Sequence, residues 1–162
     1  MISLRGSYDF AARQLRCRCA AVMIAGRQVM TLLGCMKGEG TAVSESVLRE
    51  RAKAFARKIV FLCRDMRKNR VENALINQTI ASGTSIAANL HEAQYAQSPK
   101  DFVSKMEIAL KECNEVDFWL ELLVDTDIIP KEIGNPLRKD CVEMRRMLVS
   151  TIKTMKKKLE TQ

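Results

Sequence analysis

The stretch Ser82–Leu123, SGTSIAANLHEAQYAQSPKDFVSKMEIALKECNEVDFWLELL, joins two different kinds of helix across one turn. Its first half is rich in Ala, Ser, Thr and Gly, so a helix built from it lets a neighbouring backbone approach closely. Its second half opens with Ser98-Pro99-Lys100-Asp101, which combines a hydroxyl cap, a proline that needs no N–H and a carboxylate three residues after the cap. This pattern predicts a helix that begins at Pro99.

Apolar residues repeat at alternating intervals of three and four on both sides of this stretch, which is typical of helices that bury one face. The pattern predicts helices at about 47–68, 72–96, 99–125 and 136–159. The core-facing residues are expected to be Leu48, Ala52, Phe55, Ile59, Leu62 and Met66, then Leu75, Thr79, Ser82, Ile86, Leu90 and Ala93, then Phe102, Met106, Ala109, Cys113, Val116, Leu120 and Leu123, and finally Leu137, Cys141, Met144, Leu148, Ile152, Met155 and Leu159. Short connections near 69–71, 97–98 and 127–135 favour antiparallel neighbours. We therefore expect an all-α, antiparallel up-down-up-down four-helix bundle.

The chain has 162 residues, few aromatic side chains, seven glycines and three prolines, which favours a single all-α domain. No apolar run approaches the roughly 20 residues that span a bilayer, so we expect a soluble protein with no membrane partner. The bundle is expected to occupy residues 48–162. Residues 1–47 are expected to form an extension, helical or disordered, unless translation begins downstream, for example at Met23.

Six cysteines stand at positions 17, 19, 35, 63, 113 and 141. Cys63, Cys113 and Cys141 fall on predicted apolar helix faces, which favours buried thiols in a cytoplasmic protein over disulfides. Cys17, Cys19 and Cys35 lack the spacing of a zinc site, so we expect no metal.

The net charge of +8 is distributed unevenly along the chain. Residues 48–70 contain nine bases and two acids, residues 136–162 contain eight bases and three acids, and residues 99–127 contain three bases and eight acids. Within the acidic segment, Asp101 with Lys105 and Glu107 with Lys111 are predicted ion pairs at a spacing of four.

Several of these bases repeat on the faces opposite the predicted core, and each phosphate that they neutralise would release counterions. The candidate nucleic-acid-binding residues are Arg49, Lys53, Arg57, Arg64, Lys68, Arg146, Lys153, Lys156 and Lys157. Two other interpretations remain open. The bases can form ordinary solvated faces, or they can match the acidic helix of a neighbouring subunit. Few aromatic residues are available for stacking, so any nucleic-acid binding should tolerate sequence and depend on salt.

No pattern of residues predicts catalysis. His91 is the only histidine, and its neighbour Glu92 points about 100° away from it on a helix. Ser82, Thr84 and Ser85 have no histidine placed to activate them, and Gly83 alone is no phosphate loop. We therefore expect neither an enzyme nor a cofactor.

Four runs carry a family resemblance: Ser82 to Asn89, Glu92 to Gln94, Ala96 to Ser98 with Asp101 and Phe102, and Lys105 to Leu123. Together they resemble the four-helix bundle family of proteins encoded in intervening sequences of 23S ribosomal RNA genes and accessory proteins of diversity-generating retroelements. The resemblance extends from about Leu48 to the C-terminus. It implies a homopentameric ring with RNA or DNA as a partner. For a retroelement protein, it also implies a reverse transcriptase as a partner.

The segment 99–125 also has apolar residues outside its core face, namely Ile108, Trp119 and Leu122. A second apolar stripe either widens the core or contacts another subunit, and the resemblance favours the subunit contact. The sequence thus predicts a non-enzymatic oligomeric bundle that binds RNA or DNA. The alternative is a protein-interaction scaffold, such as a reverse transcriptase accessory subunit, whose charge serves assembly.

Overall fold

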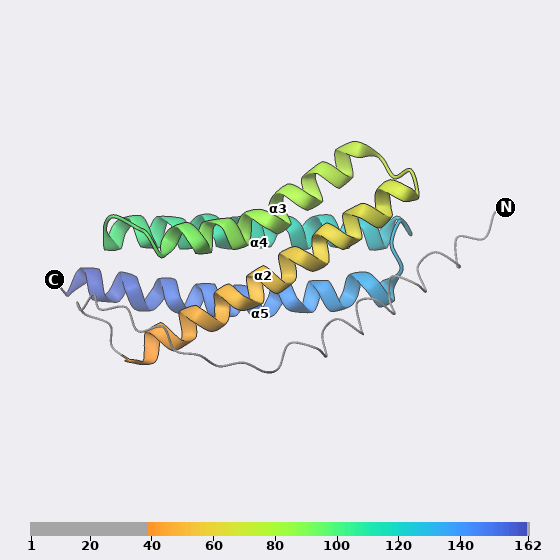
Figure 1. Ribbon diagram of the computed structural model, residues 1–162. Coiled ribbons are helices and arrows are strands. Elements are labelled where there is room, and N and C mark those ends of the chain that lie inside the picture. The colour runs from red at the N-terminus through yellow and green to blue at the C-terminus, as the bar shows by residue number, and fades with distance from the viewer. Residues whose placement is uncertain (1–38, 162) are drawn as a thin grey trace, which may run out of the picture. The chain divides into compact units, whose positions relative to one another are not determined.

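The computed structural model describes the backbone of residues 39–161 and the side chains of residues 46–161. This part of the chain forms four α-helices and no strand: α2 (Glu39–Lys68), α3 (Asn73–Ala93), α4 (Pro99–Asp125) and α5 (Lys131–Glu160). Successive helices run in opposite directions (Figure 1), with α3 between α2 and α4 in the order of packing and α5 against both α4 and α2. The predicted all-α antiparallel four-helix bundle is confirmed.

Helix α2 begins at Glu39, whereas the sequence predicted a start near Val47. Gly40, which belongs to the expected extension, lies inside this helix. One helical glycine costs only about 1 kcal/mol relative to alanine, which is too little to end a helix anchored by a buried face from Leu48 onward. The rest of the predicted extension, residues 1–38, lies outside the described residues.

Helix α4 begins at Pro99 as predicted. The Ser98 hydroxyl accepts a hydrogen bond from the Asp101 amide at 3.1 Å. The Asp101 carboxylate in turn accepts a hydrogen bond from the Gln97 amide at 3.0 Å. Side chains therefore satisfy two amides at a helix end where no intrahelical acceptor exists.

The start of the last helix was predicted wrongly. The sequence placed it at Pro136, but α5 begins at Lys131 and runs through this proline. Pro130 caps the helix, and its carbonyl accepts hydrogen bonds from the amides of Ile133 at 2.9 Å and Gly134 at 3.0 Å. Burial of Ile133 and Leu137 holds the turns on either side of Pro136 against the core, so the missing N–H does not end the helix.

The core follows the predicted periodicity closely. In α2, the residues from Leu48 to Met66 that were expected to face the core are all at most 5% exposed. Leu75, Phe102, Met155 and Leu159 were expected in the core but are only half-buried, because they lie near helix ends, where fewer neighbouring residues cover a side chain. Other apolar residues in or next to helix ends are buried although they were not predicted to be, namely Ile76, Val103, Val124, Ile129 and Ile133.

Two buried polar residues of α3, Thr79 and Ser82, bond within their own helix. The Thr79 hydroxyl donates to the Leu75 carbonyl at 2.8 Å, and the Ser82 hydroxyl donates to the Gln78 carbonyl at 2.7 Å. Such bonds satisfy hydroxyls inside an apolar core and often bend the helix. Figure 1 shows α3 changing direction partway along its length.

Gly83 of α3 packs closely against Ile59 of α2. A Cβ atom at this position would lie 2.8 Å from Cγ2 and 2.9 Å from Cγ1 of Ile59. Ile59 is β-branched and fully buried, so its side chain has little freedom to move aside. The close contact that the small residues of this segment predicted is therefore confirmed at Gly83.

Substituting Gly83→Ala should destabilise the protein although alanine is the better helix former. The gain in helix propensity of about 1 kcal/mol is outweighed by overpacking of about 1–3 kcal/mol. We expect the free energy of unfolding, measured in urea, to fall by up to about 2 kcal/mol. In an Ile59→Ala background, where the clashing atoms are gone, the same glycine substitution should be neutral or stabilising. A Gly83→Ala protein more stable than the parent would contradict this account.

Three cysteines within the described part of the chain, Cys63, Cys113 and Cys141, are buried free thiols, as predicted. Burial raises the pKa of Cys63 to about 11, although the nearby Arg67 lowers it in part. Contact with Cys113, and then burial, raises the pKa of Cys141 well above the ordinary thiol value. The reactive thiolate form is therefore suppressed at these two sites near neutral pH.

Iodoacetamide should accordingly label these three cysteines slowly in the folded protein. Because all three thiols are buried, and because the pKa values of Cys63 and Cys141 are raised, we expect labelling rates at pH 8 at least about 100-fold lower than in urea, with each site followed by peptide mass spectrometry. Rapid labelling of Cys63 in the native protein would show that the core opens there.

Candidate nucleic-acid interface

Helix α2 presents cations on the face opposite its core residues. Lys53, Arg57 and Arg64 are exposed, and within residues 46–161 none of the three has an ion-pair partner; we call them the α2 row. The guanidinium of Arg64 lies 5.8 Å from the centroid of the Phe61 ring. The α2 row therefore offers positive charge that no carboxylate of the described residues neutralises.

Two other predicted cations of α2 lie in different surroundings. Lys68 is exposed but pairs with Asp65 of the same helix at 2.9 Å. Arg49 is half-buried, and its Nε atom is buried without a hydrogen-bond partner among the described residues. Arg49 thus belongs to the edge of this face and not to its centre.

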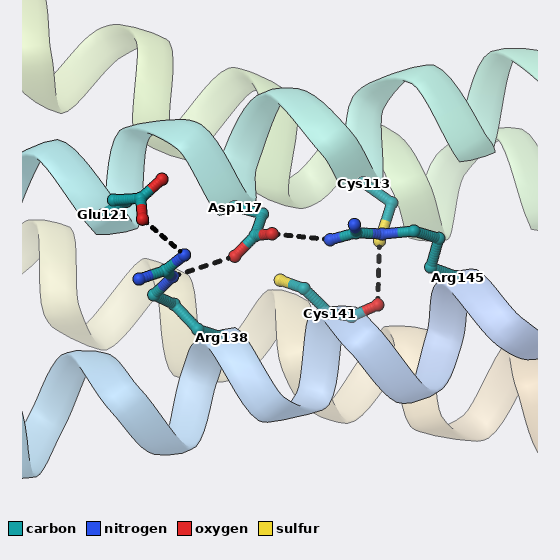
Figure 2. A network of polar contacts seen from close by, with 6 residues as sticks. All are labelled: Cys113, Asp117, Glu121, Arg138, Cys141 and Arg145. Carbon is teal, nitrogen blue, oxygen red and sulfur yellow. Dashed lines mark hydrogen bonds and ion pairs between the residues drawn. The ribbon is translucent and has the colours of Figure 1, made fainter.

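One side of helix α5 pairs with the acidic helix α4. Asp117 of α4 accepts from Arg138 Nε at 3.1 Å and from an Arg145 terminal nitrogen at 2.5 Å (Figure 2). Arg138 also binds Glu121 at 2.9 Å. The Asp117 side chain is only 16% exposed, so this junction is shielded from solvent.

Farther along the same side of α5, Lys156 binds Glu107 of α4 at 2.6 Å. Lys156 was a candidate nucleic-acid ligand, and the structure instead gives it a carboxylate partner. It remains about half exposed, at 54%.

The solvent side of α5 is different. Arg146, Lys153 and Lys157 are exposed as predicted. Lys139, which the sequence analysis missed, is exposed on the same face because it precedes Arg146 by seven residues, or two helical turns. We call Lys139, Arg146, Lys153 and Lys157 the α5 row. In the described part of the chain none of them has an ion-pair partner.

Three acids of α4 therefore form contacts within the chain. Glu107, Asp117 and Glu121 all bind α5. The pairs predicted within α4 are not the ones formed: Lys105 binds Glu92 of α3 at 2.5 Å, and Glu107 binds Lys156. Cross-helix neighbours approach these side chains more favourably than residues four apart on one helix.

Two further ion pairs join α2 to α5. Lys58 binds Asp140 at 2.7 Å, and Arg51 binds Glu143. Their side chains are at least 31% exposed, so each pair contributes only about 0–1 kcal/mol. Their main effect is on the charge of the surface. They neutralise Arg51 and Lys58 of α2, whereas the α2 row keeps its charge.

The predicted subunit contact lies on α4. Ile108 is 38% exposed, whereas Trp119 and Leu122 are half-buried. Trp119 donates from Nε1 to a Glu115 carboxylate oxygen at 3.3 Å, and its ring packs edge-on against Phe118. Phe118, which is 54% exposed, was not predicted. The apolar stripe of α4 is thus partly covered by its own helix neighbours and partly open.

Within residues 46–161, no group of three His, Cys, Asp or Glu side chains is arranged to hold a metal ion. His91 is exposed and packs edge-on against Tyr95. In the same part of the chain, no helix is long and apolar enough to cross a membrane.

Comparison with known proteins bears on this surface. No curated protein matches the chain. A crystal structure of a protein of unknown function from the S23 ribosomal protein family of Bacteroides thetaiotaomicron is similar, with 40% sequence identity and a TM-score of 0.66. The match covers 68% of this chain and 98% of that one. Residues 45–150 match the family described as 23S rRNA-intervening sequence protein. The resemblance to proteins encoded in intervening sequences of 23S ribosomal RNA genes is confirmed, and the chain belongs to the 23S rRNA-intervening sequence protein family.

Proposed function

We propose that this protein is a non-enzymatic bundle that binds RNA or DNA through the phosphate backbone, using the α2 row and the α5 row. The observation that carries the proposal is the division of cations on α5. Arg138, Arg145 and Lys156 bind carboxylates of α4, whereas the α5 row, on the next face, binds none among the described residues.

Unneutralised cations on a rigid helix attract polyanions because each phosphate contact releases condensed counterions. The described residues contain no recognised base-reading element. Binding should therefore be tolerant of sequence. The same reasoning makes salt concentration the decisive variable.

A salt titration tests the proposal directly. Fluorescence anisotropy with labelled RNA and DNA duplexes of arbitrary sequence should show affinity that falls steeply as salt rises. If four phosphates are contacted, the slope is about −3.6, so a fourfold rise in salt weakens binding by roughly 100-fold. No binding at 50 mM salt, or binding without a salt slope, would remove the proposal.

We further propose that the protein assembles into a homopentamer through the open part of the α4 stripe. Ile108 and Phe118 leave apolar surface in water, and covering such surface is favourable. Native mass spectrometry at micromolar concentration should show the pentamer. A monomer under those conditions would contradict it.

A protein partner is the second candidate function, and the exposed aromatic residues favour it. Tyr95 is 75% exposed and Phe118 is 54% exposed, and aromatic side chains are enriched at protein interfaces. A scaffold of this kind, for example an accessory subunit of a reverse transcriptase, would bind a protein with these residues and show no affinity for duplexes at low salt.

A further inference from the structure

The positive faces of α2 and α5 have no exposed aromatic side chain. The α5 row shares its face with Val142 and Ser150, and the α2 row shares its face with Val60. Phe61, the nearest aromatic ring to the α2 row, is half-buried and lies beside the Arg64 guanidinium. Among the described residues, the large exposed aromatic side chains are Tyr95 and Phe118, which belong to the turn after α3 and to α4.

This separation matters because single-stranded nucleic acids are held by two features together. A charged groove follows the backbone, and aromatic side chains stack on the unpaired bases. Here the two rows and the exposed aromatic residues lie on different elements. A single strand along either row would find phosphate partners but no surface on which to stack its bases.

The spacing of the cations leads to the same conclusion. Lys139, Arg146 and Lys153 repeat every seven residues, so they form a nearly straight line with about 10.5 Å between successive positions. The whole α5 row extends over about 27 Å of helix. A straight, rigid line of charge suits a stiff partner, because a flexible strand must lose conformational freedom to follow it.

A surface that binds by charge alone favours the polyanion with the higher charge density. Duplex DNA carries one negative charge per about 1.7 Å of its axis, whereas each strand carries one per about 3.4 Å. More counterions are condensed on the duplex, and more are released per contact. We infer that the two rows form a site selective for the backbone of double-stranded nucleic acid over single strands of the same sequence. This inference rests on the proposed function.

The test compares each duplex with its own strands. The full-length protein is titrated into fluorescein-labelled 20-mers of one non-self-complementary sequence, as RNA and as DNA, single-stranded and double-stranded, from 50 to 300 mM salt. At the lowest salt each duplex should bind at least about 10-fold more tightly than its strands. The slope of log affinity against log salt, per phosphate contact, should be about −0.9 for the duplex and about −0.7 for the single strand. Comparing the RNA and DNA probes shows whether the protein prefers duplex RNA or duplex DNA.

Two variants make the comparison specific. In Lys53→Glu/Arg57→Glu/Arg64→Glu, the preference for duplex should fall to within about threefold of the single strand. One of the two rows is lost, and the three new carboxylates repel the more densely charged duplex more strongly than a single strand. In Tyr95→Ala, which leaves the proposed subunit contact at Phe118 intact, binding to single strands should stay unchanged. A loss of single-strand affinity there would reveal a stacking site and overturn the inference.

The outcomes are distinct. Single strands that bind as tightly as duplexes, with a clear salt slope, overturn the duplex selectivity and leave nucleic-acid binding intact. No binding of any probe at 50 mM salt overturns both. A duplex preference that persists unchanged in the α2 row variant shows that the site lies elsewhere and also overturns the inference.

Discussion

The triple substitution Lys53→Glu/Arg57→Glu/Arg64→Glu should weaken duplex binding at least about 100-fold at low salt, because it removes three phosphate contacts and adds three repulsive charges. All three side chains are exposed. Exposed substitutions away from core contacts usually change stability by no more than about 0.5 kcal/mol each. Helicity measured by circular dichroism should therefore be unchanged. Anisotropy titrations against the parent protein give the loss directly.

The matched control is Lys100→Glu/Lys111→Glu/Lys131→Glu. These lysines are exposed, and within residues 46–161 none has an ion-pair partner, but they lie on α4 and at the start of α5, outside both rows. The change in net charge is the same. Because these substitutions weaken only the long-range attraction, they should reduce affinity by no more than about fivefold. Equal losses in the two triples would mean that binding follows total charge and not the α2 row.

Arg49 is deliberately left out of this triple. Its spacing of four from Lys53 suggested a place on the same face, but the side chain is half-buried. A carboxylate there would be partly desolvated and would lower stability as well as charge. An effect on binding could then not be separated from an effect on folding.

Substituting Asp117→Ala should destabilise the bundle by about 2–3 kcal/mol, the largest stability effect expected for a single charged residue here. Asp117 is the shared acceptor of Arg138 and Arg145, and its loss leaves two guanidinium groups facing each other's charge without an anion between them. Removing one partner of a buried pair costs about 3–5 kcal/mol, and the partial exposure of the arginines, 31% and 35%, reduces this. Thermal unfolding should show a fall of about 5–10 °C.

Two controls accompany this substitution. Glu121→Ala removes a partner of Arg138 that is 50% exposed, so it should cost less than about 1 kcal/mol. The triple Asp117→Leu/Arg138→Met/Arg145→Met replaces the whole charged junction and should recover most of the lost stability, since apolar residues of similar size often replace a buried ion network without cost. A change below about 0.5 kcal/mol for Asp117→Ala would show that water solvates the arginines adequately.

Local chemistry in the sequence was sufficient to predict four helices and the start of α4. Ser98, Pro99 and Asp101 placed the start of α4, because capping bonds depend on residues only a few positions apart. Periodicity identified the buried faces and the buried thiols, because a helix that packs on one side must repeat its apolar residues at that period. The family was evident from the same segment.

Pro136 shows where local rules failed. As a sequence signal it favours a helix start, yet α5 continues through it because Ile133 and Leu137 are buried on either side. Gly83 is a similar case. Its cost to the helix was predictable, but the atom that excludes a side chain there belongs to Ile59 on another helix.

The sequence by itself determined that four helices form, which of their faces are apolar and how unevenly charge is distributed among them. Only the tertiary structure decided which cations are free. Arg145 and Arg146 are adjacent in the chain, but one binds Asp117 and the other faces solvent. The physical reason is that a helix turns by about 100° per residue, so neighbouring charges meet different surroundings, and the carboxylates that neutralise them are supplied by whichever helix packs alongside.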